Sequence, residues 1–179
     1  MSEITANTQH RFLIFRHGLA TKSTTGYGEE IMSAPLLDEA IPVMEKLAEF
    51  LKTEVGDFQY SSEMLRCRQT AEIVTRVTGK EFSFDARLNE YNQEPFLQFA
   101  DRVNDFLEDI IEKADRFKQQ RVGTQEPVTI WICTHGAVVA GLKHLLMEGT
   151  FSQEYQLDYT QPGELLEIWK KNIQLHIFN

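Results

Sequence analysis

Two histidines in matching sequence contexts are the residues best suited to chemistry. His17 follows the apolar run Phe12–Phe15 and an arginine, His135 follows Val128–Cys133 and a threonine, and a glycine comes directly after each histidine. These apolar runs are too short to form helices of their own and are typical of buried strands. The glycines let the backbone turn sharply and let a ligand approach it closely. Because ligands bind beyond the carboxyl ends of parallel strands, we expect both histidines at one edge of a sheet.

An arginine and a carboxylate extend this set of candidate residues. The segment Ser61–Ala71 runs from a strand end into a helix, and Arg66 lies in the first turn of that helix. A helix N-terminus favours an anion, and the planar guanidinium group can bind two phosphate oxygens at once. Glu90 ends the segment Arg87-Leu88-Asn89-Glu90, which follows a possible short strand. Together these residues would supply a nucleophile, a cationic cradle and a proton donor.

The four segments resemble, in order, the signatures of the histidine phosphatase superfamily, in its phosphoglycerate mutase-like branch. They are Arg16-His17-Gly18, Ser62-x-x-x-Arg66-x-x-Gln69-Thr70-Ala71, Leu88-Asn89-Glu90 and Thr134-His135-Gly136. A lone Arg-His-Gly is a weak signal, whereas four ordered motifs spread over roughly residues 11–140 are a specific one. The resemblance implies a phosphoglycerate mutase-like fold.

The resemblance also implies a role for each residue. His17 is the expected nucleophile and forms a phosphohistidine that water then hydrolyses. Arg16, Arg66 and His135 are expected to hold the phosphoryl oxygens. Glu90 is expected to protonate the leaving oxygen and then deprotonate the attacking water, which requires a raised pKa. No metal and no cofactor is expected, because arginines and histidines supply the positive charge.

The chain departs from the family pattern at a few positions. Leu19-Ala20 stands where many members carry a small polar residue, and Ala40 stands where glycine is usual. Neither change removes a catalytic group, although both argue against a close assignment within the superfamily. Arg68 is a neighbour of Arg66, and we expect it to be a solvated helix residue rather than a phosphate ligand.

Alternating strands and helices must position these side chains. The expected strands are Phe12–Phe15, Phe58–Ser61, Phe82–Phe84, Val128–Cys133, Leu165–Trp169 and Ile173–Phe178, the last two joined by a hairpin turn at Lys171-Asn172. The first expected helix starts at an Asp38 N-cap and extends to about Leu51. The other expected helices are Met64–Thr78, Pro95–Phe117 and Ala137–Met147, and Thr21–Gly28 is expected to be a loop. This order predicts an α/β fold, a three-layer αβα sandwich with a central, mostly parallel sheet. The aromatic stripe of Pro95–Phe117 is expected to face the core.

Composition limits the possible partners and compartment. The 179 residues fit a single domain over 1–179, with residues 1–10 expected to be a flexible N-terminal segment. A net charge of −9 argues against binding to nucleic acid or to an anionic membrane. No apolar stretch has the length of a signal peptide core or a membrane span, so a cytoplasmic location is expected. Cys67 and Cys133 are expected to be reduced core thiols, and the oligomeric state stays open.

The leading functional hypothesis is a metal-independent phosphatase that hydrolyses a small phosphorylated metabolite. Only 44 residues lie between Glu90 and His135, and one helix fills half of them, which leaves little room for the large lid expected of a cofactor-dependent phosphoglycerate mutase. The alternatives are a phosphohistidine protein phosphatase acting on a phosphoprotein, such a mutase, and a non-catalytic phosphate-binding module. The natural substrate is not fixed by the sequence.

Overall fold

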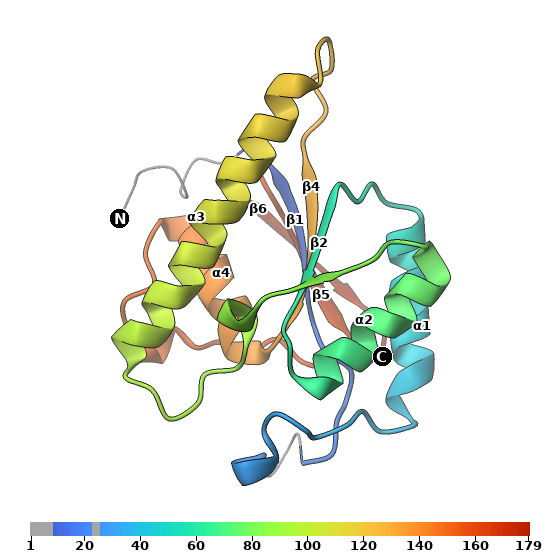
Figure 1. The fold of residues 1–179 in the computed structure, drawn as a ribbon, viewed down its shortest axis with the longest axis vertical. Coiled ribbons are helices and arrows are strands. Elements are labelled where there is room, and N and C mark those ends of the chain that lie inside the picture. Colours follow the sequence, from blue (N-terminus) through green and yellow to red (C-terminus); the bar gives the residue numbers. More distant parts are fainter. Residues whose placement is uncertain (1–8, 23–25) are drawn as a thin grey trace.

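The computed structural model describes residues 9–22 and 26–179, which form a mixed sheet between two layers of helices (Figure 1). The strands are β1 Arg11–Arg16, β2 Phe58–Ser61, β3 Ser83–Phe84, β4 Thr129–Thr134, β5 Glu164–Trp169 and β6 Asn172–Ile177. The α-helices are α1 Ala40–Lys52, α2 Leu65–Thr78, α3 Phe96–Gln120 and α4 Gly136–Glu148, and short 3₁₀ turns occupy Gly28–Glu30, Ala86–Leu88 and Glu154–Gln156. The predicted α/β fold is confirmed.

The strand order β3-β2-β4-β1-β5-β6 determines which residues share an edge of the sheet. β3, β2, β4 and β1 are mutually parallel, and the antiparallel β5–β6 hairpin extends the sheet beyond β1. In the register of the central strands, Arg16 pairs with Thr134 and Ser61 pairs with Cys133. The carboxyl ends of β1, β2 and β4 therefore meet at one edge, the lower one in Figure 1.

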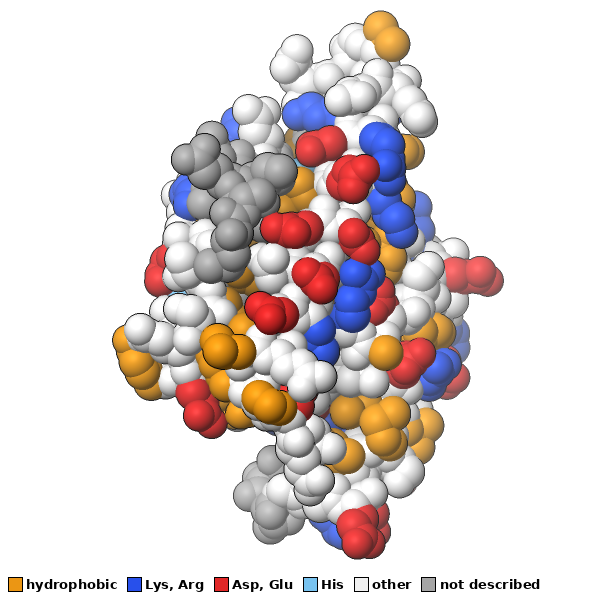
Figure 2. Space-filling view, turned by 60° about the vertical axis from the view of Figure 1, so that its left-hand side comes forward, with side chains coloured by type: hydrophobic (Ala, Val, Ile, Leu, Met, Phe, Trp, Pro, Cys, Tyr) orange, Lys and Arg blue, Asp and Glu red, His pale blue; other side chains and the backbone are white. Residues whose placement is uncertain are grey.

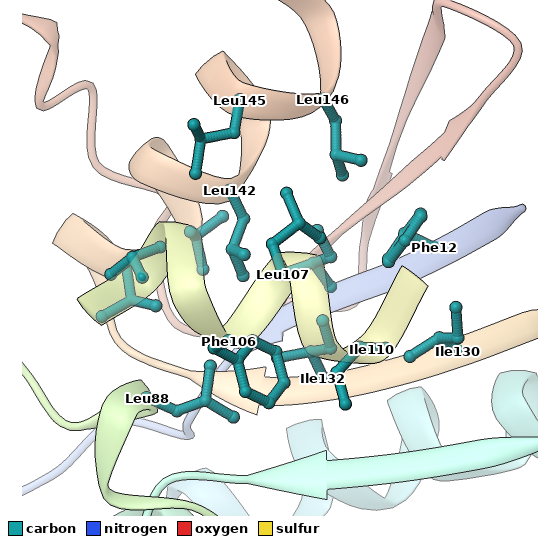
Figure 3. Close-up of a cluster of buried hydrophobic side chains, with 14 of the residues drawn as sticks. Phe12, Leu88, Phe106, Leu107, Ile110, Ile130, Ile132, Leu142, Leu145 and Leu146 are labelled. Atoms are coloured by element: carbon teal, nitrogen blue, oxygen red, sulfur yellow. The ribbon is translucent and has the colours of Figure 1, made fainter. Parts of the chain in front are cut away.

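The helices cover both faces of the sheet, so the apolar residues of the central strands are buried on both sides. α3 and α4 lie on one face and α1 and α2 on the other (Figure 1). Figure 3 shows the larger core cluster, in which Phe106 and Ile110 of α3 and Leu142 of α4 face Phe12 and Ile132 of the strands. The second cluster joins α1 and α2 to the opposite face. The predicted role of the α3 aromatic stripe in the core is confirmed.

The outer side of α3 has the opposite character. Its exposed carboxylates are Asp101, Asp105, Asp109, Glu112 and Asp115. Figure 2 shows acidic and basic side chains along this part of the surface. The helix is thus amphipathic, with the apolar side toward the sheet and the charged side toward solvent.

Some predicted boundaries were wrong. α1 begins at Ala40 rather than after an Asp38 cap, because Asp38 accepts a hydrogen bond from Ile41 N in a turn that leads into the helix. The hairpin turn lies at Lys170-Lys171, where both residues have positive φ, one position earlier than predicted.

The predicted loop and the predicted N-terminal segment are described only in part. Gly28, the last residue of the predicted loop, opens a 3₁₀ turn, and residues 23–25 lie outside the described part. Of the predicted flexible segment, residues 1–8 lie outside it as well. Gln9 and His10 are fixed in place, because Gln9 O accepts from Trp169 Nε1 at 3.2 Å and His10 Nε2 lies 2.6 Å from Asp115 Oδ1.

Candidate active site

His17 and His135 lie side by side at the carboxyl edge of the sheet. The pairing of Arg16 with Thr134 places each histidine one residue beyond its strand, and their ring centroids are 5.1 Å apart. Both side chains are buried. The expectation that the two histidines meet at one edge is confirmed.

The turn after His17 depends on a glycine. A Cβ atom on Gly18 would lie 2.9 Å from Met44 Cγ and 3.1 Å from Ala40 Cβ, so α1 approaches too closely for a larger residue. Gly18 N donates to Thr70 Oγ1 at 3.1 Å. The Thr70 hydroxyl in turn donates to Arg66 O at 2.8 Å, which ties the turn to the first part of α2.

The hydrogen bonds of His17 fix its tautomer. Nδ1 lies 2.7 Å from Gly18 O, and because a carbonyl oxygen can only accept, Nδ1 carries the proton. Nε2 accepts from Arg66 Nε at 3.1 Å and so bears the lone pair. Burial, followed by the charges of Arg66 and Arg16, holds the pKa of His17 well below its usual value. His17 is therefore a neutral imidazole with a defined nucleophilic atom, Nε2.

Arg66 lies at the centre of the site and is fully buried. Besides His17, its guanidinium contacts Nδ1 of His135, at 3.2 Å from Nη2, and the carbonyl oxygen of Ile31. The ring of Tyr27 stacks on it, with the centroid 3.9 Å from Cζ. Both histidines and the segment after β1 thus converge on a single cation.

His135 is held in a chain of hydrogen bonds. A guanidinium can only donate, so Nδ1 of His135 accepts from Arg66, and the proton lies on Nε2. Nε2–H donates to Ser62 Oγ at 2.8 Å, and the Ser62 hydroxyl donates to Asn89 Oδ1 at 2.9 Å. Burial, followed by the influence of His17 and the arginines, lowers the pKa of His135 well below its usual value. His135 is neutral as well.

Arg16 has a buried donor group without a partner among the described residues. Its Nη1 donates to Thr160 O at 3.0 Å, while its buried Nε finds no hydrogen-bond partner among the described residues. A buried N–H without an acceptor is costly, so a donor left free at a site edge is suited to an anionic ligand.

Glu90 is half-buried and lies within electrostatic reach of both arginines. Its Oε1 accepts from Tyr91 N at 2.9 Å. Burial raises the pKa of Glu90, although the N–H groups of Tyr91 and Ala137 and the charges of Arg16 and Arg66 oppose that rise. The structure therefore brings together His17, Arg66, His135 and Arg16, and Glu90 lies within electrostatic range of the two guanidinium groups.

The remaining residues singled out in the sequence are Arg68 and the two cysteines. Arg68 packs over the Phe84 ring, with 4.2 Å from Cζ to the centroid, and donates to Glu63 O; it is half-buried rather than solvated as expected. Cys67 and Cys133 are buried free thiols, as predicted, and Cys67 Sγ lies 3.4 Å from His135 Nε2. Within the described ranges, no group of three or more His, Cys, Asp or Glu residues could hold a metal ion.

Sequence reasoning missed several residues of the site. Ser62 and Asn89 lie inside quoted motifs but received no role, and Thr160 contributes only a backbone oxygen, which has no sequence signal. Arg102 of α3, which binds the segment that carries Glu90, was also missed. Its position at the edge of an apolar stripe, three residues after Phe99, was the available signal.

The family comparison agrees with this geometry. The model of the histidine phosphatase superfamily (branch 1) matches residues 12–95, which include the first three of the four motifs. Over this range, just under half of its length, the chain is similar to this superfamily. The match ends before Thr134-His135-Gly136, and it is the fold that brings this fourth motif to the site. No curated protein sequence matches the chain.

Solved structures of other proteins share the fold. The chain resembles the alpha-ribazole phosphatase from Shigella flexneri (19% identity, 94% of this chain and 96% of that chain, TM-score 0.71). It also resembles a mycobacterial glucosyl-3-phosphoglycerate phosphatase, with 16% identity over 95% of this chain and 98% of that chain and a TM-score of 0.72. A third similar structure is the phosphoglycerate mutase from Bacillus anthracis, with 14% identity over 97% of this chain and 94% of that chain and a TM-score of 0.70. Because the last of these is named a mutase and is spanned almost completely, chain length does not by itself distinguish a phosphatase from a mutase.

Among the described residues, no helix combines the length and the apolar character that crossing a membrane requires.

Proposed function

We propose that this protein hydrolyses a phosphomonoester of a small molecule through a phosphohistidine on Nε2 of His17. The observation that carries the proposal is the state of His17, a neutral ring whose lone pair is fixed by Gly18 O and held beside Arg66 and His135. A buried nucleophile between fixed donors is the arrangement that covalent phosphoryl transfer needs.

In the first step, the Nε2 lone pair forms a bond to phosphorus while the ester P–O bond breaks. The proton of Glu90 goes to the leaving oxygen, which requires the protonated form that burial favours. As the ring gains positive charge, its Nδ1–H bond to Gly18 O strengthens and stabilises the charge. One phosphoryl oxygen replaces His17 Nε2 as the acceptor of the hydrogen bond from Arg66 Nε, and another accepts a hydrogen bond from Arg16 Nε.

In the second step, water attacks phosphorus from the side that the leaving group has vacated. Glu90, now a carboxylate, accepts a proton from that water, and the N–P bond breaks, returning the electron pair to His17 Nε2. Inorganic phosphate leaves, and Glu90 is protonated again. Every proton and electron pair is thereby restored without a metal or a redox partner.

The test is hydrolysis of p-nitrophenyl phosphate in excess EDTA, comparing wild type with His17→Ala. Turnover by the wild type that survives EDTA and is lost in the variant supports the proposal. Activity retained by His17→Ala would eliminate His17 as the nucleophile. A wild type that binds phosphate without turning over either this ester or a phosphohistidine protein would instead be a phosphate-binding module, and one that accepts only the phosphoprotein would be a protein phosphatase.

A further inference from the structure

Arg102 of α3 is bound to the segment that carries Glu90. Its Nη1 donates to two carbonyl oxygens, Arg87 O and Asn89 O, at 2.7 Å each. Its Nη2 donates to Glu90 O at 3.1 Å. Three backbone acceptors on one short segment therefore converge on a single guanidinium group, which lies twelve residues farther along the chain.

The surroundings of Arg102 hold the guanidinium in one orientation. Nε donates to Glu94 Oε2 at 3.1 Å, so the charge is balanced within the same loop. Cζ lies 4.8 Å from the ring centroid of Phe99, one turn earlier on the helix, and the side chain is only 20% exposed. Phe99 is itself fully buried in the core cluster. The loop is thus attached to α3, the long helix that packs against this face of the sheet.

We propose that Arg102 is a positioning residue that fixes the backbone of Glu90, so that its carboxyl group faces the leaving oxygen. This inference rests on the proposed function, in which Glu90 is the acid and base. Only a guanidinium can satisfy this set of acceptors, because they need a planar fork with five donors. A lysine at position 102 keeps the charge but cannot donate to Glu94 and to three separated carbonyl oxygens at once.

The inference predicts an effect that depends on the leaving group. p-Nitrophenolate leaves readily and needs little help from an acid, whereas phenol, with a pKa of about 10 as in tyrosine, needs its oxygen protonated. A displaced Glu90 therefore slows phenyl phosphate far more than p-nitrophenyl phosphate. The two esters have nearly the same shape, so general damage to the binding site lowers both rates by the same factor.

The experiment measures kcat/KM for both esters in the wild type, Arg102→Lys, Arg102→Ala and Glu90→Gln. Arg87→Ala is the matched control, because Arg87 also links this segment to α3, through Asp109, without touching Glu90. We expect kcat/KM of both Arg102 variants to fall at least about tenfold more on phenyl phosphate than on p-nitrophenyl phosphate, a difference within the range of general-acid effects. Glu90→Gln is expected to change the ratio of the two kcat/KM values in the same direction. We expect Arg87→Ala to keep the wild-type ratio of kcat/KM for phenyl phosphate to kcat/KM for p-nitrophenyl phosphate.

Equal losses on the two esters in the Arg102 variants would overturn the inference, and so would a ratio that Arg87→Ala shares. If Arg102→Ala does not fold, Arg102→Lys carries the test, with thermal unfolding as the check on its fold. A wild type that hydrolyses neither ester, or a Glu90→Gln variant with an unchanged ratio, would count against the proposed function itself. The two failures are therefore distinguishable.

Discussion

Individual residues of the site are arranged so that two histidines stay neutral beside two permanent cations. His17 and His135 are buried, and the nearby guanidinium groups further disfavour their protonated forms. Arg66 donates to both rings, so each ring presents its lone pair to the same cation. The pKa of Glu90 is shifted in the opposite direction, because burial favours its protonated form. Burial thus shifts Glu90 and the two histidines toward the uncharged forms that the proposed mechanism requires.

The pH dependence of kcat/KM for phenyl phosphate follows from these shifts. His17 must be deprotonated, and its lowered pKa extends activity below the pH range of an ordinary histidine. In the proposed mechanism Glu90 must be protonated in the first step, and its raised pKa extends activity above the range of an ordinary glutamate. We expect a bell-shaped profile, with His17 controlling the acid limb and Glu90 the alkaline limb.

Glu90→Gln is expected to remove the alkaline limb and to lower the rate by about 10²–10⁴. Glu126→Gln, at an exposed position before β4, is the control and should leave the profile unchanged. Because the phosphate ester titrates with a pKa of about 6, the variants are compared on the same substrate so that its ionisation cancels. An alkaline limb that persists in Glu90→Gln would show that another group acts as the acid.

Among the secondary-structure elements, α3 has two roles, core packing and attachment of the Glu90 segment. Phe106 is fully buried, and its ring packs edge-on against Tyr60 of β2, with centroids 5.5 Å apart. Four residues before it, Arg102 binds the backbone at Glu90. Loss of packing along this helix therefore affects both the stability of the fold and the geometry of the site.

Phe106→Ala is expected to lower the free energy of unfolding by about 3–5 kcal/mol, because it leaves a cavity in the core. The control on the same helix is Leu97→Ala, since Leu97 is 65% exposed and such changes usually stay within about 0.5 kcal/mol. Urea unfolding of both variants measures the difference. Similar values for the two would contradict the placement of Phe106 in the core.

Local sequence patterns predicted most of the elements, because apolar periodicity and glycine caps are local signals. β2 was predicted at its observed bounds, and α2 ends before Gly79, whose positive φ caps the helix. Contacts between distant segments carry no such signal. The bond of Arg66 to Ile31 O and the bonds of Arg102 to the Glu90 segment depend on how helices and loops pack, so sequence reasoning could nominate Arg66 only by motif and missed Arg102.

Over the whole molecule, the overall charge and the charge at the site have opposite signs. The chain carries −9 in total, and the exposed carboxylates of α3 contribute to it (Figure 2). The candidate site instead gathers Arg16 and Arg66 at the carboxyl edge of the sheet. Any attraction for an anion is therefore short-ranged and depends on these two side chains rather than on the field of the protein.

Oxyanion binding should stabilise the folded chain. We expect orthovanadate to raise the melting temperature, by an amount equivalent to about 2.7 kcal/mol at a hundredfold excess over its Kd. Arg66→Lys should lose most of this shift, and Arg68→Ala, in the same helical turn, should keep it. If orthovanadate raised the melting temperature of Arg66→Lys as much as that of the wild type, the anion would bind at another site.

The phosphoenzyme is the most direct test of His17 as the nucleophile. Wild type is mixed with ³²P-labelled phenyl phosphate, quenched in alkali within one turnover, digested, and searched for the labelled residue, with His17→Asn treated in parallel. We predict an alkali-stable, acid-labile phosphoryl group on His17 in the wild type and no label in the variant. Turnover by the wild type without any labelled protein, or with the label on another residue, would contradict the mechanism.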